Sequence, residues 1–430
     1  MKQVKTIGLV EDGALVQASN CLEDAEEFCL MADNHKGYGM PVGGVAVYKD
    51  KISPSGVGFD IACGNKAVKT NLKYEDIKDN VSYLADLIKD TLSFGIGRKN
   101  KEKVDHKLFD SDLWNIDFYK ENPELKKLAK EQLGTIGSGN HYVDVFKDEN
   151  NDIWIGVHFG SRGLGHKTAS HFMTIAGDNL NIMDEKPHLL DANSKDGQDY
   201  IKAMTLCGLF AYAGRDWVCS KVAELLNAKI IEEVHNHHNF AWKEIHNGIE
   251  YWVIRKGATP AFPNQLGFVG GSMGDNAVII RGLESEKSKE FFYSAMHGAG
   301  RVMSRTQALG KSKKSKVWQC GNRNCGHFID YFNLKQNEAK PLCEKCNSKM
   351  NKWTKFTETT KGVVNFEEVQ TELKLKGIEL RGAGADEAPA VYKRLTEVLE
   401  CHKDTIEVIH TLTPLIVCMA GSDEFDPYKD

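Results

Sequence analysis

Residues 31–66 are dense in glycine and lack the apolar spacing that an amphipathic helix requires. The segment is MADNHKGYGMPVGGVAVYKDKISPSGVGFDIACGNK. Glycine and proline favour tight turns, and surface loops often carry the polar groups that bind ligands. We therefore predict short strands joined by turns over this region, with polar side chains presented from the loops.

Helices and strands are both expected elsewhere in the chain, without strict alternation. Ile77, Val81, Leu84 and Ile88 have helical spacing, which predicts an amphipathic helix over 74–92. Residues 199–226 carry a broad apolar surface and predict a longer helix. Shorter segments predict strands at 154–161, 250–257 and 405–412 and helices at 366–373 and 391–400. This mixture indicates an α+β fold.

The composition is that of an ordinary globular protein. The chain has 430 residues, 41% of them hydrophobic and 27% charged, with a formal net charge of −5. No run approaches the length of a membrane span, and the start lacks the apolar core of a secretory signal. We therefore expect a cytoplasmic protein with no membrane association. The mild acidity excludes a chain that is basic throughout, but it leaves open a local basic cleft that binds nucleic acid.

Four cysteines form two close pairs, Cys320-x4-Cys325 and Cys343-x2-Cys346. Four thiolates satisfy the tetrahedral preference of zinc, and four protein ligands leave no open position for chemistry. We therefore predict a structural zinc site of the zinc-ribbon type. Four unrelated cysteines are the alternative, and His327 could replace Cys325 as a ligand. The flanking lysines either form a solvated surface or hold a phosphate backbone.

An abrupt change in composition marks the cysteine-bearing segment as an insertion. After Ser304 the chain reads KSKKSK at 311–316, then carries the cysteine pairs, then reads NKWTKF at 351–356. We predict a catalytic core in two parts, residues 1–312 and 358–430, with a small module at 313–357 inserted between them.

Residues suited to metal ions recur in other glycine-dense segments, namely GVGFDIACG, GSGNHY, HFGSRG and MHGAGR. A lone histidine is more often structural than a ligand, so the argument depends on the whole set. If they converge, Cys63 could bridge two ions and Asp60 could reach one of them. Manganese, zinc or iron would suit such a site, and metal pairs commonly stabilise a transferring phosphoryl group. The candidates are Asp60, Cys63, Asn140, His141, His158, residues 235–239 and His297.

Basic residues near these segments also fit phosphate chemistry. Arg162 follows His158, and Lys256 lies at the end of a predicted strand. Arg301 and Arg305 lie four and eight residues after His297. A helix through this segment would put all three on one face, where the arginines could grip phosphates. Surface ion pairs are the alternative for each of these residues.

Eight ordered motifs carry a specific resemblance. They are GVGFDIACG, GTIGSGNHY, VHFGSRGLGH, HHNF, RKGA, GSMG, HGAGRVMSR and DEAPAVYK. Together they resemble the signature set of the RtcB family, the GTP-dependent RNA ligases of tRNA splicing and RNA repair. The match covers roughly residues 31–310 and 360–421, and the cysteine module interrupts it. The resemblance implies a single large RtcB-like catalytic domain.

The resemblance also implies a reaction sequence. A histidine, here His297, attacks the α-phosphate of GTP and forms a covalent guanylate. The guanylate passes to an RNA 3′-phosphate, and a 2′,3′-cyclic phosphate end is first opened to that form. The 5′-hydroxyl of a second RNA then attacks the activated RNA–pp–G end, and GMP leaves. The expected RNA partners are tRNA halves or broken RNAs, and a need for an activating accessory protein is left open.

Roles for individual residues follow from the motif match. Two manganese ions are expected. Asp33 and His35 are expected to line the site, and Asp144 stands where the family usually has a longer glutamate that pairs with guanine. The expected metal ligands are Asp60, Cys63, His141, His158 and His238; the GTP contacts are Asn140, Asp144, Asn239, Ser272 and Tyr392; the RNA phosphate contacts are Arg162, Lys256, Arg301 and Arg305.

The C-terminus departs from the family pattern. Many members end in a lysine-glycine pair whose lysine touches the nucleotide, whereas this chain reads VCMAG and continues, with Ala420 at roughly that position. Lys429 folding back to replace it is one hypothesis, and relaxed base selectivity is another. Two other function classes stay open at this point: a dinuclear metallohydrolase acting on phosphoesters, and a non-catalytic RNA-binding protein.

Overall fold

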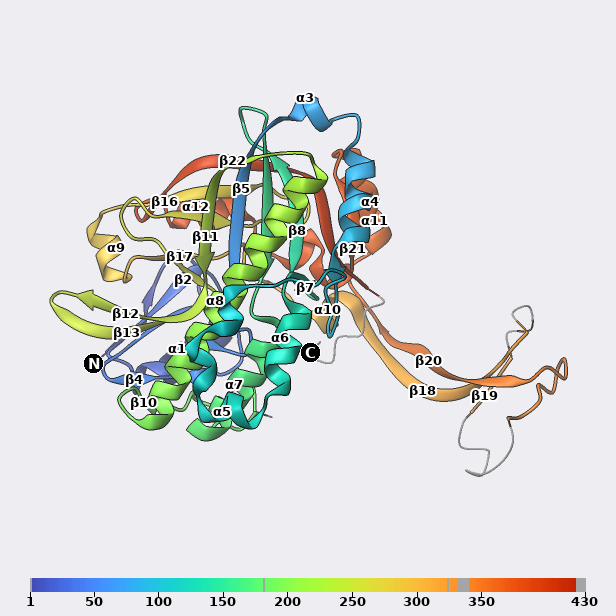
Figure 1. The fold of residues 1–430 in the computed structure, drawn as a ribbon, viewed down its shortest axis with the longest axis horizontal. Helices are drawn as coiled ribbons and strands as arrows, with labels where there is room; N and C mark the ends of the chain where they lie inside the picture. The colour runs from blue at the N-terminus through green and yellow to red at the C-terminus, as the bar shows by residue number, and fades with distance from the viewer. Residues whose placement is uncertain (1, 181, 323–324, 326, 331–339, 423–430) are drawn as a thin grey trace.

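An eight-stranded sheet forms the centre of the body (Figure 1). The structure is a computed structural model that describes residues 2–180, 182–322, 325, 327–330 and 340–422. The strand order is β11-β5-β9-β8-β22-β16-β15, and β21 pairs in parallel with β22. The strands are β5 (Gly64–Lys73), β8 (Tyr142–Lys147), β9 (Asp152–Phe159), β11 (Ile230–His237), β15 (Leu266–Val269), β16 (Ala277–Gly282), β21 (Glu379–Ala383) and β22 (Ile406–Gly421).

A five-stranded sheet with the order β1-β2-β3-β13-β12 lies next to it. The chain passes from one sheet to the other at His238, the residue between β11 and β12. The strands of this second sheet are β1 (Lys5–Thr6), β2 (Glu27–His35), β3 (Val42–Tyr48), β12 (Asn239–His246) and β13 (Ile249–Lys256). Short pairs are β4 (Lys51–Ile52) with β10 (Leu190–Asp191), β6 (Ser93–Phe94) with β7 (Thr135–Gly137), and β14 (Ala258–Pro260) with β17 (Ser294–Met296).

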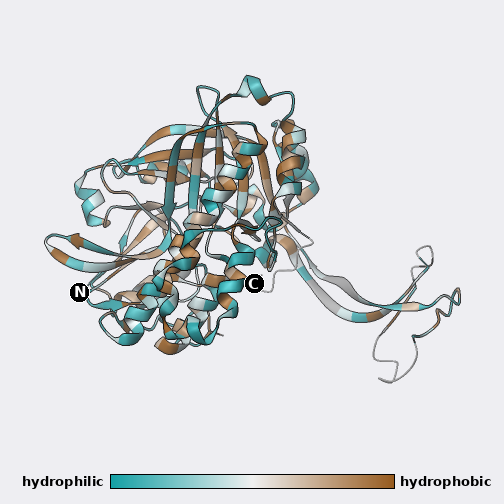
Figure 2. Ribbon diagram, viewed as in Figure 1, coloured by the Kyte–Doolittle hydropathy of each residue, from teal (hydrophilic) through white to brown (hydrophobic). Residues whose placement is uncertain are grey.

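The longest helix, α8 (Lys195–Leu225), packs against β9 and β5. Ser194 caps its start by accepting a hydrogen bond from the backbone N–H of Gly197. Val218 and Val222 on the helix join a buried cluster with Val157 of β9, and Figure 2 shows apolar residues on both helices and strands of the body. The other helices are α1 (Asp12–Leu22), α2 (Pro54–Val57), α3 (Tyr74–Ile77), α4 (Val81–Thr91), α5 (Asp117–Glu121), α6 (Glu124–Gln132), α7 (Arg162–Ala176), α9 (Glu286–Glu290), α10 (Arg305–Leu309), α11 (Phe366–Leu375) and α12 (Leu395–Cys401).

A long antiparallel hairpin projects from the body (Figure 1). It consists of β18 (Gly310–Cys320) and β20 (Met350–Lys361), with the short β19 (Phe328–Asp330) paired to the far end of β18. Pairing runs from Gly310 opposite Lys361 to Cys320 opposite Met350. We call this hairpin and the segment between its strands, residues 310–361, the arm. The predicted limits of the inserted module, 313–357, stay a prediction.

The predicted α+β class is confirmed, because helices and strands are mixed throughout the body. The long helix predicted over 199–226 is also confirmed as α8. In the described part of the chain, no helix combines the length and apolar character that crossing a membrane requires.

Two helix predictions were wrong in extent. The helix predicted over 74–92 is broken into α3 and α4 at the polar residues 78–80, where Asp79 and Asn80 disfavour a helix interior. The helix predicted over 391–400 begins only at Leu395. Tyr392 before it has extended backbone angles and forms an isolated bridge with Arg301, so a tertiary contact overrides the local helical pattern.

Candidate active site and metal centre

The predicted metal ligands meet at one edge of the large sheet. Cys63 directly precedes β5, His141 precedes β8, His158 lies near the end of β9, and His238 follows β11. Neighbouring strands among these four run antiparallel, so starts and ends alternate along the same edge. The sheet register therefore brings together residues that are up to 175 positions apart in the chain.

The ligand atoms fall into two groups that share one sulfur. Cys63, His158 and His238 form one group, and Asp60, Cys63 and His141 form the other, with the ligand atoms of each group within 4.8 Å of one another. The Cys63 Sγ lies 3.6 Å from Nε2 of both His141 and His158. His141 Nε2 also lies 3.0 Å from Asp60 Oδ2. This arrangement is compatible with metal binding, and the bridging of two ions by Cys63 stays a prediction.

The charge states of these groups suit divalent cations. Burial lowers the pKa of His158 and of His238 well below the ordinary value, so both imidazoles are neutral and keep a lone pair. Burial raises the pKa of Asp60, but hydrogen bonding to His141 outweighs it and brings the pKa to about 2. Nδ1 of His238 is buried without a hydrogen-bond partner, as expected of a nitrogen that accepts a metal.

A second layer of contacts orients the ligands. Nδ1 of His141 hydrogen-bonds to the carbonyl of Ile136, and Nδ1 of His158 hydrogen-bonds to Oδ1 of Asn65. These bonds leave Nε2 of each ring facing Cys63, which is the usual way in which a protein fixes a metal-binding histidine. Asn65 also donates through Nδ2 to the carbonyl of His297, so it links the metal ligands to the predicted nucleophile.

Arg215 was missed by the sequence interpretation. It lies in the middle of α8, is fully buried, and donates from Nη1 to the carbonyls of Ala62 and Phe159 at 3.1 and 2.5 Å. Ala62 immediately precedes Cys63, and Phe159 immediately follows His158. Arg215 therefore holds the two ligand segments together. The sequence did contain one signal for this residue, because a charged side chain within an apolar helical segment is unusual.

His297 follows β17 and lies beside the metal ligands. Its ring centroid is 4.7 Å from that of His238. Oδ2 of Asp33, which is fully buried, accepts hydrogen bonds from the backbone N–H of His297 at 3.0 Å and from its Nδ1 at 2.7 Å. Asp33 thereby fixes the imidazole so that Nε2 carries the free lone pair. His35 lines the same cavity, and burial lowers its pKa to about 4.

A cavity of about 320 Å³ opens over these groups. All five residues expected to bind GTP line it: Asn140, Asp144, Asn239, Ser272 and Tyr392. Burial raises the pKa of the Asp144 carboxyl well above its usual range, and its Oδ1 has no hydrogen-bond partner. Tyr142, which the sequence interpretation did not single out, adds a buried hydroxyl that also has no partner. The inner cavity therefore holds polar atoms available to a ligand.

The predicted phosphate-binding residues divide into two sets. Lys256, Arg301 and Arg305 line the cavity, whereas Arg162 is not among its lining residues and instead packs behind His141. Lys256 donates to the backbone carbonyls of Tyr38 and Ser55, and burial lowers its pKa to about 8. Lys256, Arg301 and Arg305 therefore bring basic side chains to the lining of the cavity.

The proposed shared helix through His297, Arg301 and Arg305 was wrong. The chain bends between His297 and Ser304, and α10 begins only at Arg305. Two buried carboxylates orient the arginines instead. Glu387 lies 3.4 Å from Arg301 and 3.2 Å from Arg305, and Asp386 lies 3.6 Å from Arg305. The tyrosine hydroxyl of Tyr392 completes this network through Arg301 and Glu387.

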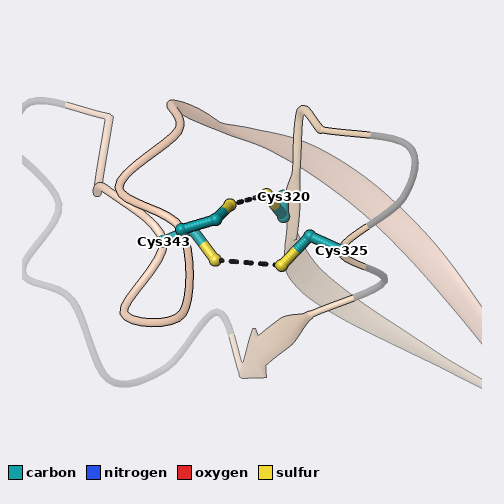
Figure 3. Close-up of side chains that lie close together, drawn as sticks. Cys320, Cys325 and Cys343 are labelled. Atoms are coloured by element: carbon teal, nitrogen blue, oxygen red, sulfur yellow. Dashed lines mark hydrogen bonds between the residues drawn. The ribbon is translucent and has the colours of Figure 1, made fainter.

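The four cysteines of the arm also come together (Figure 3). Sγ of Cys320 lies 3.3 Å from Sγ of Cys346, and Sγ of Cys325 lies 3.6 Å from Sγ of Cys343. His327 is outside this group of ligand atoms. The set therefore has four sulfurs in mutual reach, which is the arrangement that tetrahedral zinc requires.

The end of β22 lies beside the cavity. Ala420 is buried near the end of β22, beside the cavity wall formed by Val417 and Met419. Lys429 lies outside the described residues, so its suggested role stays a prediction.

The fold and site define a protein with a cavity of about 320 Å³ above two groups of candidate metal ligands that share Cys63. A family model described as tRNA-splicing ligase RtcB matches residues 15–329. The RNA-splicing ligase RtcB of Escherichia coli K12 is 34% identical over 424 residues, which cover 92% of this chain and 90% of that protein. The tRNA-splicing ligase RtcB of Thermococcus kodakarensis is 31% identical and covers 71% of this chain and 80% of its own. The chain belongs to the RtcB family.

Proposed function

We propose that the protein is an RNA ligase that joins an RNA 3′-phosphate or 2′,3′-cyclic phosphate end to a 5′-hydroxyl end, in tRNA splicing or RNA repair. One observation carries the proposal: His297, oriented by Asp33, lies beside a two-group metal centre at the base of a cavity with an arginine wall. Relatives that match nearly the whole chain are named RNA-splicing ligases.

Two manganese ions are the proposed metals. Cys63, His158 and His238 would hold one, and Asp60, Cys63 and His141 would hold the other. The residues fit such ions because the buried imidazoles of His158 and His238 are neutral. In addition, Nδ1 of His238 is buried and has no hydrogen-bond partner, so it is available to bind a metal ion. When bound, divalent ions of this kind neutralise charge on phosphate oxygens and lower the barrier to phosphoryl transfer.

GTP is the proposed co-substrate. Its phosphates would contact Asn140 and Asn239 beside the metal ligands, and its nucleoside would contact Asp144, Ser272 and Tyr392. The free lone pair of His297 Nε2 attacks the α-phosphorus, since Nδ1 is committed to Asp33. A P–N bond forms, the bond to the β-phosphate oxygen breaks, and pyrophosphate leaves with the electron pair.

The remaining steps transfer the guanylate and then release it. An oxygen of the RNA 3′-phosphate attacks the guanylate phosphorus, and the P–N bond breaks, which returns the lone pair to His297. The 5′-hydroxyl oxygen of the second RNA then attacks the RNA 3′-phosphorus, loses its proton to solvent, and displaces GMP. Arg301, Arg305 and Lys256 hold the negative RNA phosphates during these steps.

A direct test uses two RNA oligonucleotides, one ending in a 3′-phosphate and one beginning with a 5′-hydroxyl, with manganese and with or without GTP. We expect a joined product that requires GTP, and no product from control RNAs with 3′-hydroxyl and 5′-phosphate ends. Loss of the 3′-phosphate without joining, and without a need for GTP, would instead identify the metallohydrolase alternative.

The arm is proposed to hold zinc through Cys320, Cys325, Cys343 and Cys346. The support is the mutual reach of the four sulfurs and the preference of zinc for tetrahedral thiolate sites. A zinc-to-protein ratio near one in purified protein, measured by elemental analysis, is the expected result.

A further inference from the structure

The arm and the rest of the molecule carry opposite charge. Residues 310–361 contain 12 lysines and arginines against 4 aspartates and glutamates, a net charge of +8. The whole chain has a net charge of −5, so the remaining residues carry −13. A zinc ion with four thiolates contributes −2 and still leaves the arm near +6. Such a charge asymmetry is the electrostatic footprint of a nucleic-acid-binding surface.

The root of the arm adjoins the cavity. Arg305 lines the cavity and is the first residue of α10, and α10 leads directly into β18 at Gly310. Backbone hydrogen bonds from the N–H groups of Val363 and Val364 to the carbonyls of Gln307 and Ala308 fasten the segment that follows β20 to the same helix. A polyanion that leaves the cavity past Arg305 therefore meets the base of the arm first.

The arm offers a long polar surface with an exposed aromatic ring. Eleven residues of β18 span about 35 Å at the usual rise of roughly 3.4 Å per residue. Lys311, Lys316, Lys349 and Lys361 are exposed along it. Trp353 on β20 is 58% exposed, whereas Trp318 is buried in the tip with Cys320 and Met350. One tryptophan thus stabilises the arm and the other is available for stacking.

We propose that the arm is an RNA-docking surface that holds the phosphate backbone of substrate RNA beyond the joined ends. This inference rests on the proposed ligase function, which brings RNA ends to the cavity at the root of the arm. Lysines along the arm contact phosphates without regard to sequence, and Trp353 stacks on an unpaired base.

The test replaces Lys311, Lys316, Lys349 and Lys361 together with glutamine and measures RNA affinity without GTP. Two 3′-phosphate RNAs are compared: one of about 4 nucleotides, which is too short to extend along the arm from the cavity, and one of about 20 nucleotides, which can reach along it. We expect weaker binding of the long RNA alone. The slope of log affinity against log salt should fall by about 3, because each lost phosphate contact removes roughly 0.7–0.9.

A matched variant controls for total charge. It replaces four exposed lysines of the body with glutamine, namely Lys49, Lys51, Lys202 and Lys243. This variant should bind both RNAs like the wild type. Equal binding of the long RNA by wild type and arm variant would overturn the proposal and point to an acidic protein as the partner. Equal weakening for the short and long RNAs would also overturn it, because the effect would not be local to the arm.

Two further readouts sharpen the test. Trp353→Ala should weaken binding of the long RNA by roughly tenfold and leave the short RNA unchanged. Self-guanylylation of the arm variants should equal that of the wild type, since no substituted residue lines the cavity. Because binding is measured without nucleotide, a failure of the ligase proposal and a failure of the docking proposal give different results.

Discussion

The two clusters of metal-type ligands in this molecule are built in opposite ways. The body cluster draws residues from positions 60 to 238 and depends on the register of four strands. The arm cluster draws four cysteines from 27 consecutive residues, 320–346, and depends on two short turns. Four of the five candidate body ligands are buried, whereas Cys346 of the arm is exposed.

The difference between the two clusters indicates which part of the molecule needs a metal ion in order to fold. The arm has a small core of Trp318, Cys320, Cys343 and Met350, so a metal must supply much of its stability. The body has extensive cores that do not include its metal ligands. Removing metal from the body should therefore abolish catalysis and preserve the fold of the body. Removing metal from the arm should unfold the tip of the arm and preserve catalysis.

The largest effect is expected from Cys63→Ala, because its sulfur belongs to both ligand groups of the body. Formation of the covalent guanylate should fall by about 1,000-fold, which corresponds to roughly 4 kcal/mol of lost charge stabilisation. Bound manganese should fall while the circular dichroism spectrum is retained. Cys219→Ala, at a buried cysteine on α8, is the matched control and should keep its manganese and its activity. A fully active Cys63→Ala protein would refute the shared-ligand account.

Asp33→Asn should have the next largest effect on the body. The substitution removes the charge that orients His297, and we expect guanylate formation to fall about 100-fold, or roughly 2.7 kcal/mol. The dissociation constant for GTP, measured by isothermal titration, should stay within about twofold, because Asp33 acts through the imidazole. A parallel loss of GTP affinity would mean that Asp33 serves the pocket and not the nucleophile.

Mild acid should weaken the body through His402. Burial lowers the pKa of this histidine to about 4, and its Nε2 accepts a hydrogen bond from the backbone N–H of Ala32. The unfolded chain, with a pKa near 6.5, binds the proton more readily, so stability falls as the pH drops below that value. Between pH 7 and pH 5 this one group should cost about 2 kcal/mol of unfolding free energy. Urea titrations of wild type and His402→Gln should show the smaller pH dependence in the variant; equal slopes would contradict the assignment.

Cys343→Ser should have the smallest effect on catalysis. We expect zinc to be lost and amide hydrogens over residues 317–320 and 350–353 to exchange faster, because the tip loses its metal-supported core. Guanylate formation should stay within about twofold of wild type. Cys401→Ser, outside the cluster, should keep its zinc. A large loss of guanylate formation in Cys343→Ser would show that the arm and the body are coupled.

The sequence was most informative where chemistry and local pattern coincide. The cysteine spacing predicted the arm cluster, and helical spacing predicted α8 within four residues at its start. The motif set predicted the body ligands, which the sheet register then brought together. These features depend on residue type and short spacing, both of which a single sequence contains.

Contacts between residues that are distant in the chain could not be predicted from residue type and short spacing. The late start of α12 comes from the bridge between Tyr392 and Arg301, which are distant in the chain. The break between α3 and α4 has a local cause, the polar residues 78–80, which the apolar spacing alone did not take into account. Arg162 was predicted to contact RNA phosphate; it packs behind His141 and is not among the residues that line the cavity, so this role stays a prediction. The charge of Arg215 within an apolar helical segment was visible in the sequence, but its partners are carbonyls about 50 and 150 residues away in the chain, so the sequence could not indicate its role.

In the proposed reaction His297 forms a covalent bond to a guanylate, and this step requires the metal ions of the body. The most direct measurement is incubation of the purified protein with α-labelled GTP and manganese, followed by denaturing electrophoresis of wild type and His297→Ala. The account predicts a label that survives denaturation in the wild type and is absent from the variant. An unlabelled wild-type protein with its metals in place, or an equally labelled His297→Ala protein, would contradict the account.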